Sequence, residues 1–152
     1  MLRTLLPVLL ALNCTAIVAQ PLSGYFVAGV GGRQGKLVTQ AALGAEYLVG
    51  ESPFSVGAEL GVIAGHDSFV PVSFNGYYHP LTPPARCKLD PFVTAGYTEG
   101  LSIFGSAGHF LNTGAGLNYW FRRRAGVRME FRALVKAGPV SINSFRAGIA
   151  FR

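Results

Sequence analysis

The stretches NTGAGLNYWF (residues 112–121) and AGVRMEFRALV (residues 125–135) alternate between two kinds of side chain. Odd-numbered positions are mostly apolar, whereas even-numbered positions carry mainly glycine, asparagine, arginine and glutamate, with Trp120 among them. Successive side chains of a β-strand point to opposite faces, so each stretch has one apolar face and one mainly polar face. This pattern is typical of a transmembrane β-barrel, with lipid outside and polar groups inside.

The first residues indicate export. MLRTLLPVLLALNCTAIVAQ has a basic start at Arg3, an apolar stretch over residues 5–18, and a small residue, Ala19, at a cleavage point. We therefore expect residues 1–19 to be a signal peptide and residues 20–152 to form one barrel domain. The alternative, a membrane anchor, is disfavoured because the stretch is shorter than the ~20 apolar residues that a helical span needs.

The composition favours the same fold. Half of the residues are hydrophobic and 13% are charged, yet no segment after the leader resembles a membrane-spanning helix. Only helices and closed barrels satisfy their backbone polar groups in lipid, so a barrel is expected. Turn residues divide the chain into eight strands of an all-β, antiparallel, up-and-down transmembrane barrel. The first four expected strands cover residues 24–31, 38–49, 54–64 and 69–78. The fifth begins near residue 91, the sixth near residue 110, the seventh follows the turn 122–124, and the eighth covers residues 144–152. Pro71 predicts a rim or weakly paired start for the fourth strand.

Eight strands enclose a lumen that side chains can fill, which argues against a porin. The alternation places three acids and three arginines in it: Glu46, Glu59, Glu130, Arg128, Arg132 and Arg146. Charges in so narrow a space must be paired, because an unpaired ion removed from water costs several kcal/mol. We interpret the set as a structural ion-pair plug with no open pore. A gated proton or ion path and a carboxylate-based catalytic group are the alternatives.

Aromatic residues near the turns predict an interfacial girdle. Its expected members are Tyr47, Phe54, Tyr77, Tyr78, Phe92, Tyr119, Phe121 and Phe151. Binding specificity, if present, is expected in the outer loops, residues 31–37, 65–68, 99–109 and 136–143. These loops are short, so a large receptor site is not expected.

Four motifs carry a resemblance to a known family: PFVTAGY, NTGAGLNYWF, RRRAGVRMEFR and the closing FRAGIAFR. In order and spacing they resemble the small outer-membrane-protein β-barrel family, which includes the OmpA-like and OmpW-like eight-stranded barrels. The resemblance covers the whole chain after the leader and is strongest over residues 91–152. It implies an integral protein of the cell outer membrane of a Gram-negative bacterium, with a periplasmic N-terminus and the longer loops outside.

The resemblance also implies a partner. The partner during insertion is the barrel-assembly machinery. The net charge of +6 separately favours outer-membrane lipid and lipopolysaccharide as acidic neighbours, and we expect the barrel to be a monomer. Phe145, Ile149 and Phe151 form the expected C-terminal insertion signal. Members of the family usually finish on an aromatic residue, whereas Arg152 follows Phe151 here.

The sequence favours a structural or surface-interaction role over catalysis. A lipid-modifying enzyme would need a serine, histidine and acid set, and the sequence offers only His66 with Asp67 and Ser68, and His109 near Ser106. No nucleophile motif surrounds either serine, so we expect no enzyme, and the spread of the three histidines predicts no metal site.

Four further points complete the expectations from the sequence. A soluble secreted barrel carrying a small apolar ligand would require the opposite assignment of faces. The net charge of +6 does not predict nucleic-acid binding in an exported chain without basic-aromatic clusters. We expect no cofactor, because the glycines lie at strand spacing and not before a helix. Cys87 has no partner once the leader and Cys14 are removed, so no internal disulfide is expected.

Overall fold

The computed structural model describes residues 22–65, 68–81, 88–102, 105–136 and 141–152, with the backbone alone for 105–107. The expected signal peptide, Cys87, His66 and Asp67 lie outside the described residues. Among the described residues, no helix is long and apolar enough to cross a membrane.

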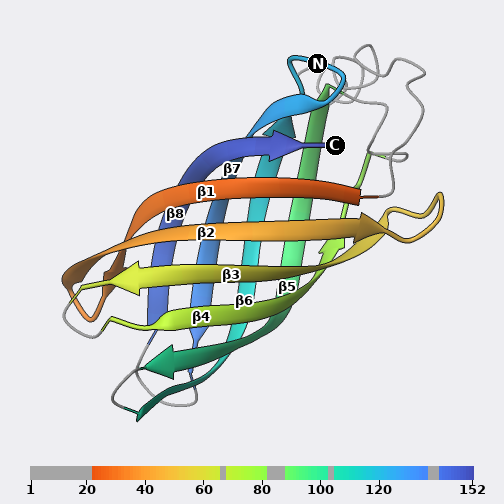
Figure 1. The fold of residues 1–152 in the computed structure, drawn as a ribbon. Coiled ribbons are helices and arrows are strands. Elements are labelled where there is room, and N and C mark those ends of the chain that lie inside the picture. Colours follow the sequence, from red (N-terminus) through yellow and green to blue (C-terminus); the bar gives the residue numbers. More distant parts are fainter. Residues whose placement is uncertain (1–21, 66–67, 82–87, 103–104, 137–140) are drawn as a thin grey trace, which may run out of the picture.

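The described residues form eight β-strands. They are β1 (Leu22–Arg33), β2 (Lys36–Leu48), β3 (Phe54–Ala64), β4 (Val70–Tyr78), β5 (Leu89–Ser102), β6 (Gly105–Tyr119), β7 (Ala125–Val135) and β8 (Ser141–Phe151). Each strand pairs antiparallel with its neighbour in chain order, and β1 pairs with β8 to close the barrel (Figure 1). The eight-stranded, antiparallel, up-and-down barrel expected from the sequence is confirmed.

The two ends of the barrel differ. Gly24, near the start of β1, pairs with Phe151, the last residue of β8, so β1 begins and β8 finishes at one end. We call this the terminal end; it also carries the β2–β3, β4–β5 and β6–β7 connections (Figure 1). The opposite end, the loop end, carries the other four connections.

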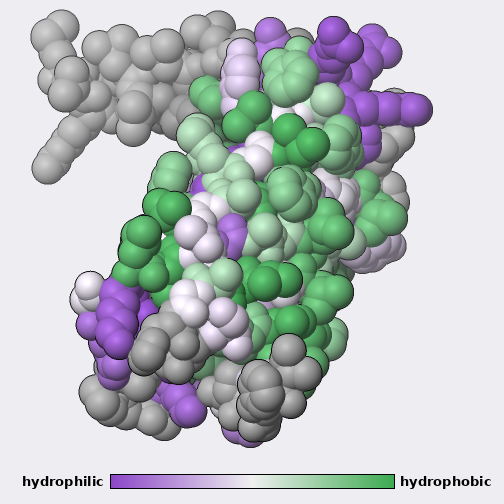
Figure 2. Space-filling view, turned by 60° about the vertical axis from the view of Figure 1, so that its left-hand side comes forward, coloured by the Kyte–Doolittle hydropathy of each residue, from purple (hydrophilic) through white to green (hydrophobic). Residues whose placement is uncertain are grey.

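The outer wall is apolar. Leu43, Phe74 and Leu111 point outward and are each more than 60% exposed (63%, 64% and 68%). Hydrophobic surface covers the middle of the barrel, and hydrophilic groups gather toward its two ends (Figure 2). Seven charged residues of the strands instead point inward and are buried: Glu46, Glu59, Asp90, Arg128, Glu130, Arg132 and Arg146. This arrangement confirms the assignment of faces and contradicts the soluble-carrier hypothesis, which needs an apolar interior and a polar exterior.

Several connections at the loop end are shorter than the sequence predicts. Between β1 and β2 only Gln34 and Gly35 lie outside the strands, both with positive φ (49° and 77°). β5 continues to Ser102 and β6 begins at Gly105, so the predicted loop 99–109 is mostly strand, with an irregular register between Gly100 and Leu101. The prediction was wrong because it rests on the glycine and serine content of the segment, whereas ladder hydrogen bonds need only the backbone.

Pro71 marks a weak point in the wall, as the sequence predicts. The β3–β4 ladder reaches Leu60 and Val72 and is interrupted at Pro71, which pairs with Gly100 on the β5 side. Beyond the interruption, a bridge between Ile63 and Phe69 resumes the pairing. Proline has no N–H to donate, so the β3 side of this position lacks a ladder hydrogen bond. The expectation of a weakly paired position is confirmed.

The aromatic girdle is partly as expected. Six of its expected members are exposed near the terminal end: Tyr47, Phe54, Tyr78, Tyr119, Phe121 and Phe151. Tyr77 and Phe92, each only 2% exposed, point into the lumen, so their assignment to the girdle was wrong. Tyr77 shares the parity of the buried residues Ser73 and Asn75, and this alternation decides its face although it lies next to a turn.

Inside the barrel, large rings lie against glycine. A side chain at Gly44 would collide with the ring of Tyr25, and one at Gly116 with the ring of Phe92. Each pair lies across two neighbouring strands, since Tyr25 faces Gly44 in the β1–β2 ladder and Phe92 faces Gly116 in the β5–β6 ladder. These glycines are therefore what lets aromatic residues fill a narrow lumen.

The loop end of the lumen is apolar, which the sequence analysis did not anticipate. One cluster of buried residues fills it: Val38, Ile63, Phe69, Phe110, Leu134 and Ile142. The rings of Phe69 and Phe110 stack with centroids 5.6 Å apart. The lumen is thus closed by hydrocarbon at this end and by polar groups farther inside.

Candidate functional site

The six charged residues predicted for the lumen all lie there. Neighbouring strands on one side supply two of the acids, and β7 and β8 supply the remaining four residues from the other side. All are at most 6% exposed: Glu46, Glu59, Arg128, Glu130, Arg132 and Arg146. On β7, every second residue points inward, so Arg128, Glu130 and Arg132 share one face. The structure brings the whole set together as one network across the lumen.

Glu130 is the centre of this network. Its carboxylate contacts Arg128 Nε at 3.3 Å, Arg132 Nε at 2.7 Å and Arg146 Nη2 at 3.1 Å. The Glu130 carboxylate is therefore an ion-pair partner of all three arginines. Such sharing offsets part of the cost of removing several ions from water.

Glu59 forms the second node. It accepts hydrogen bonds from Arg146 Nη1 at 2.7 Å and Nη2 at 3.0 Å, and from Arg132 Nη1 at 2.8 Å. Tyr25 adds a fourth donor, with its hydroxyl 2.9 Å from Glu59 Oε2. Paired charge-assisted hydrogen bonds of this kind are stronger than neutral ones and fix the geometry of both partners.

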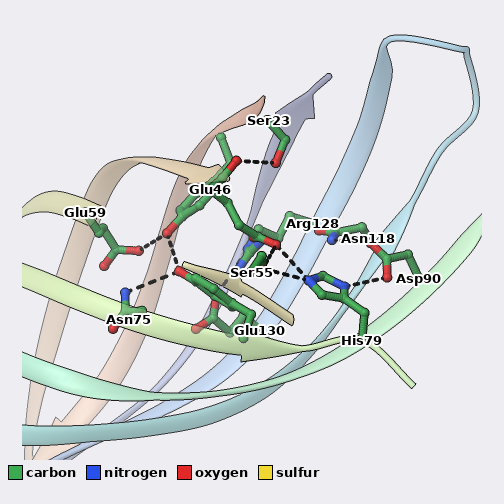
Figure 3. Close-up of polar contacts among 12 residues, drawn as sticks. Ser23, Glu46, Ser55, Glu59, Asn75, His79, Asp90, Asn118, Arg128 and Glu130 are labelled. Carbon is green, nitrogen blue, oxygen red and sulfur yellow. Dashed lines mark hydrogen bonds and ion pairs between the residues drawn. The ribbon is translucent and has the colours of Figure 1, made fainter. Parts of the chain in front are cut away.

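Glu46 connects the network to the terminal end. Its Oε2 accepts a hydrogen bond from Arg128 Nη1 at 3.2 Å, and its Oε1 lies 2.7 Å from both Ser55 Oγ and His79 Nε2 (Figure 3). The other imidazole nitrogen, His79 Nδ1, lies 2.7 Å from Asp90 Oδ1. Asn118 donates to the remaining Asp90 oxygen at 3.0 Å. His79 therefore bridges two carboxylates.

His79 and Asp90 are functional candidates that the sequence does not predict. The signal that could have found them is parity: His79 continues the inward face of Asn75 and Tyr77, and Asp90 shares the inward face of Phe92. His79 follows the last residue of β4, outside the strands. Burial alone would lower the pKa of His79, but the hydrogen bonds to Asp90 and Glu46 outweigh burial and raise its pKa to about 9. The protonated imidazole makes the lumen balanced, with four carboxylates facing three guanidinium groups and one imidazolium.

Aromatic rings enclose the guanidinium of Arg128. Its Cζ atom lies 4.1 Å from the ring centroid of Tyr25, 4.0 Å from that of Phe92 and 5.3 Å from that of Tyr77. Arginine stacks well on aromatic faces because its charge is delocalised and weakly hydrated. The rings thus replace water around a cation that is only 1% exposed.

Ser55, His79 and Asp90 have the connectivity of a hydrolase triad. Ser55 Oγ lies 3.2 Å from His79 Nε2, and His79 Nδ1 contacts the acid. A triad needs an unprotonated Nε2 to take the serine proton. Here Glu46 Oε1 holds Nε2 as a donor and also accepts the Ser55 hydroxyl, and the serine is 2% exposed. The arrangement therefore supports ion pairing and gives no support to catalysis.

The rim residues weighed for catalysis do not form a triad in the described part of the chain. Ser68 hydrogen-bonds the backbone of Gly65, while His66 and Asp67 lie outside the described residues. His109 lies on the outer surface of β6, where its Nδ1 contacts Glu99 and the Tyr97 hydroxyl. The side chain of Ser106 is likewise outside what the structure describes.

A layer of neutral hydrogen bonds lies on the β4, β5 and β6 side of the lumen, next to the charged network and the apolar cluster of the loop end. Ser73 Oγ and Thr98 Oγ1 are 2.8 Å apart, and Asn112 Nδ2 donates to the same threonine at 2.9 Å. All three side chains are at most 2% exposed. Polar groups at this depth are stable only when hydrogen-bonded, so this layer is a fixed part of the lumen.

The residues of the expected insertion signal lie on the outer face of β8. Phe145, Ile149 and Phe151 are 53%, 47% and 50% exposed. They form an apolar stripe along one face of the strand. Their role in insertion stays a prediction.

Solved structures of similar fold complete the description. The N-terminal β-barrel domain of Pseudomonas aeruginosa OprF aligns with a TM-score of 0.62 at 18% identity, covering 87% of this chain and 97% of that one. Neisserial surface protein A aligns with a TM-score of 0.65 at 9% identity over the same shares, 87% and 97%. This chain has the fold of the small eight-stranded outer-membrane β-barrels. Neither a protein-family model nor the sequence of a curated protein matches it.

A designed protein also shares this fold, so the fold by itself does not indicate a function. A de novo transmembrane β-barrel aligns with a TM-score of 0.58 at 20% identity, covering 88% of this chain and 96% of the design. A shared fold does not imply a shared function, since function depends on the side chains placed on it. The outer-membrane fold expected from the resemblance is confirmed, and the role must be argued from the lumen and the surface.

Proposed function

We propose that this protein is an integral outer-membrane barrel with a structural role, whose lumen is sealed and passes no solute. The observation that carries the proposal is the network in which Glu130 contacts three arginines and Glu59 contacts two of them. These residues come from β3, β7 and β8, so the network spans the barrel from wall to wall.

Further layers on either side of the network support the seal. Toward the loop end lie the Ser73–Thr98 layer and the apolar cluster. Toward the terminal end lie the His79–Asp90 pair and Trp120, whose ring stacks with the guanidinium of Arg152 at 4.2 Å. A solute crossing the lumen would have to separate ion pairs in a medium of low dielectric constant, where an unpaired ion costs several kcal/mol.

The space beside the network is small. One cavity lined by Glu59, Arg132 and Arg146 leaves about 10 Å³ for the centre of a water-sized guest. That is about the room that a single water molecule needs. The cavity therefore has room for a water molecule beside the ion network, which is consistent with a filled lumen.

Location and partners follow from the exterior. The belt of exposed apolar side chains requires lipid around it, because such a surface would aggregate in water. A closed barrel has no free strand edge, which is consistent with a monomer. In this proposal the barrel-assembly machinery reads Phe145, Ile149 and Phe151, and lipopolysaccharide contacts the loop end. The connections there are short, which favours structural over receptor function.

Two experiments test the proposal. The expressed chain is fractionated and run on gels with and without heating, and we expect recovery in the outer membrane with a heat-dependent mobility shift. Purified barrel is then added to a planar lipid bilayer, with a porin of known conductance as the positive control. We expect no single-channel steps. Recovery as soluble protein would contradict the membrane location, and stable conductance steps would contradict the sealed lumen.

A further inference from the structure

The β6–β7 connection at the terminal end carries three consecutive arginines. We call Arg122, Arg123 and Arg124 the arginine turn; all three side chains are exposed. They contrast with the arginines of the lumen, each of which is paired with a carboxylate. Within the described part of the chain, no carboxylate forms an ion pair with any member of the arginine turn.

The backbone of this turn is held in place. Arg122 donates its N–H to Ala125 O at 3.0 Å. From the neighbouring strand end, Arg152 donates its backbone N–H to Arg124 O at 3.2 Å and its Nε to Arg123 O at 3.2 Å. The Arg152 guanidinium is itself fixed against the ring of Trp120. The three side chains therefore extend from a fixed base, which lowers the entropic cost of binding a ligand.

The surroundings fix the depth of the turn in the membrane. Tyr119 and Phe121 immediately precede it, and Phe151 pairs with Ala125 just after it; all three rings are exposed. Exposed aromatic residues occupy the boundary between hydrocarbon and headgroups. The arginine turn follows Phe121 directly in the chain. Its guanidinium groups consequently lie just beyond this boundary, at the depth of the lipid phosphates.

The charge at this end is strongly basic. Its exposed charged side chains in the described structure are Lys88 and the three arginines, against the single carboxylate of Glu51 in a different connection. Lys88 belongs to the same surface, because its backbone carbonyl accepts a hydrogen bond from the backbone N–H of Trp120 at 2.7 Å. Guanidinium groups match phosphate oxygens in a two-point geometry, so this surface suits a phosphate-bearing anion.

We propose that the arginine turn is a binding site for the phosphate groups of anionic phospholipids in the leaflet at the terminal end. The proposal rests on the membrane location argued above. The apolar girdle beneath the turn packs against acyl chains while the arginines engage the headgroup, so one lipid contacts both. The same contacts fix how deeply this end of the barrel lies in the bilayer.

The test compares lipid binding by variants of the full chain. Refolded protein in neutral detergent is titrated with phosphatidylglycerol or with phosphatidylcholine of the same acyl chains, and bound lipid is counted by native mass spectrometry. The turn variant is R122Q/R123Q/R124Q. The matched control, R33Q/K36Q/K136Q, removes three positive charges at the loop end. A heat-dependent gel shift is required of each variant, so that loss of the barrel itself is seen separately from loss of lipid binding.

We expect the wild-type chain to prefer phosphatidylglycerol, and the turn variant to lose on the order of a hundredfold in affinity, from roughly fivefold for each of the three charges removed near an anionic surface. The loop-end control should keep the preference. Equal binding of both lipids by the wild type, or an unchanged preference in the turn variant, would overturn the proposal.

Discussion

Arg128 and Glu46 are 82 residues apart in the chain, and Arg128 Nη1 donates a hydrogen bond to Glu46 Oε2 across the lumen at 3.2 Å. The same guanidinium lies between the rings of Tyr25 and Phe92. One residue of β7 thus contacts side chains from β1, β2 and β5. Its position depends on the whole barrel, so removing it should affect the whole barrel.

The variant Arg128→Ala should lower the stability of the barrel by about 3–5 kcal/mol, because it leaves Glu46 and Glu130 with one counter-ion fewer in a buried site. Thermal unfolding in detergent measures the change. Trp120 is the single tryptophan and is buried, so its fluorescence reports the transition. The control Arg122→Ala removes an equal charge from an exposed position and should change stability by less than about 0.5 kcal/mol. An unchanged transition in Arg128→Ala would refute the plug.

A double-mutant cycle on Glu46 and Arg128 should show coupling of about 1–3 kcal/mol. Each single alanine variant leaves a buried charge without its partner, whereas the double variant removes both charges and relieves that penalty. The measurement is the free energy of unfolding in urea for the four proteins, in the same detergent. Strictly additive effects would mean that the 3.2 Å contact contributes no interaction energy.

The faces of the strands could be predicted from the sequence because alternation divides each strand into two faces, and arginine, glutamate and glycine on one of them mark it as the inner face. This assignment placed Glu130 and its neighbours in the lumen correctly. Tyr77 and Phe92 were misplaced where closeness to a turn was given more weight than parity. The apolar cluster at the loop end, with Ile63 and Phe110, was missed because inward positions were expected to be polar.

Contacts across the lumen could not be predicted in the same way. Which inward residue of β2 meets which residue of β4 depends on the stagger of the strands around the barrel, and alternation does not determine stagger. The bridge from Glu46 through His79 to Asp90 is of this kind. Predicting this bridge requires the stagger of the strands in three dimensions, although parity alone could have placed His79 inside the barrel.

His79 predicts how stability depends on pH. Its pKa in the barrel is about 9, against about 6.5 for an unfolded histidine. The folded form binds this proton more tightly, so the contribution to stability is complete below about pH 6.5 and is lost as pH rises through about 9. The free energy of unfolding should therefore fall by roughly 3 kcal/mol between pH 6 and pH 10.

The variant His79→Asn serves as the control for this pH dependence. It removes the titrating group while keeping a side chain that can donate a hydrogen bond. Urea unfolding across the same pH range should then give a curve flatter than that of the wild type by the same amount. A wild-type curve that rises with pH, or a variant with the wild-type slope, would show that His79 is not protonated in the folded barrel.

The junction of β1 and β8 should be intolerant of side chains at Gly148. A Cβ atom built there collides with the carbonyl oxygen of Phe26 and lies 2.7 Å from Val27 Cα, and both of these are backbone atoms that cannot rotate away. Gly148→Ala should therefore cost about 1–3 kcal/mol through forced backbone shifts. The matched control is Gly32→Ala on β1, where a Cβ atom would have no neighbour within 4 Å. Refolding yield, read from the heat-dependent gel shift, and the thermal transition measure both variants. Equal tolerance of the two substitutions would show that the ladder between β1 and β8 is looser than this geometry requires.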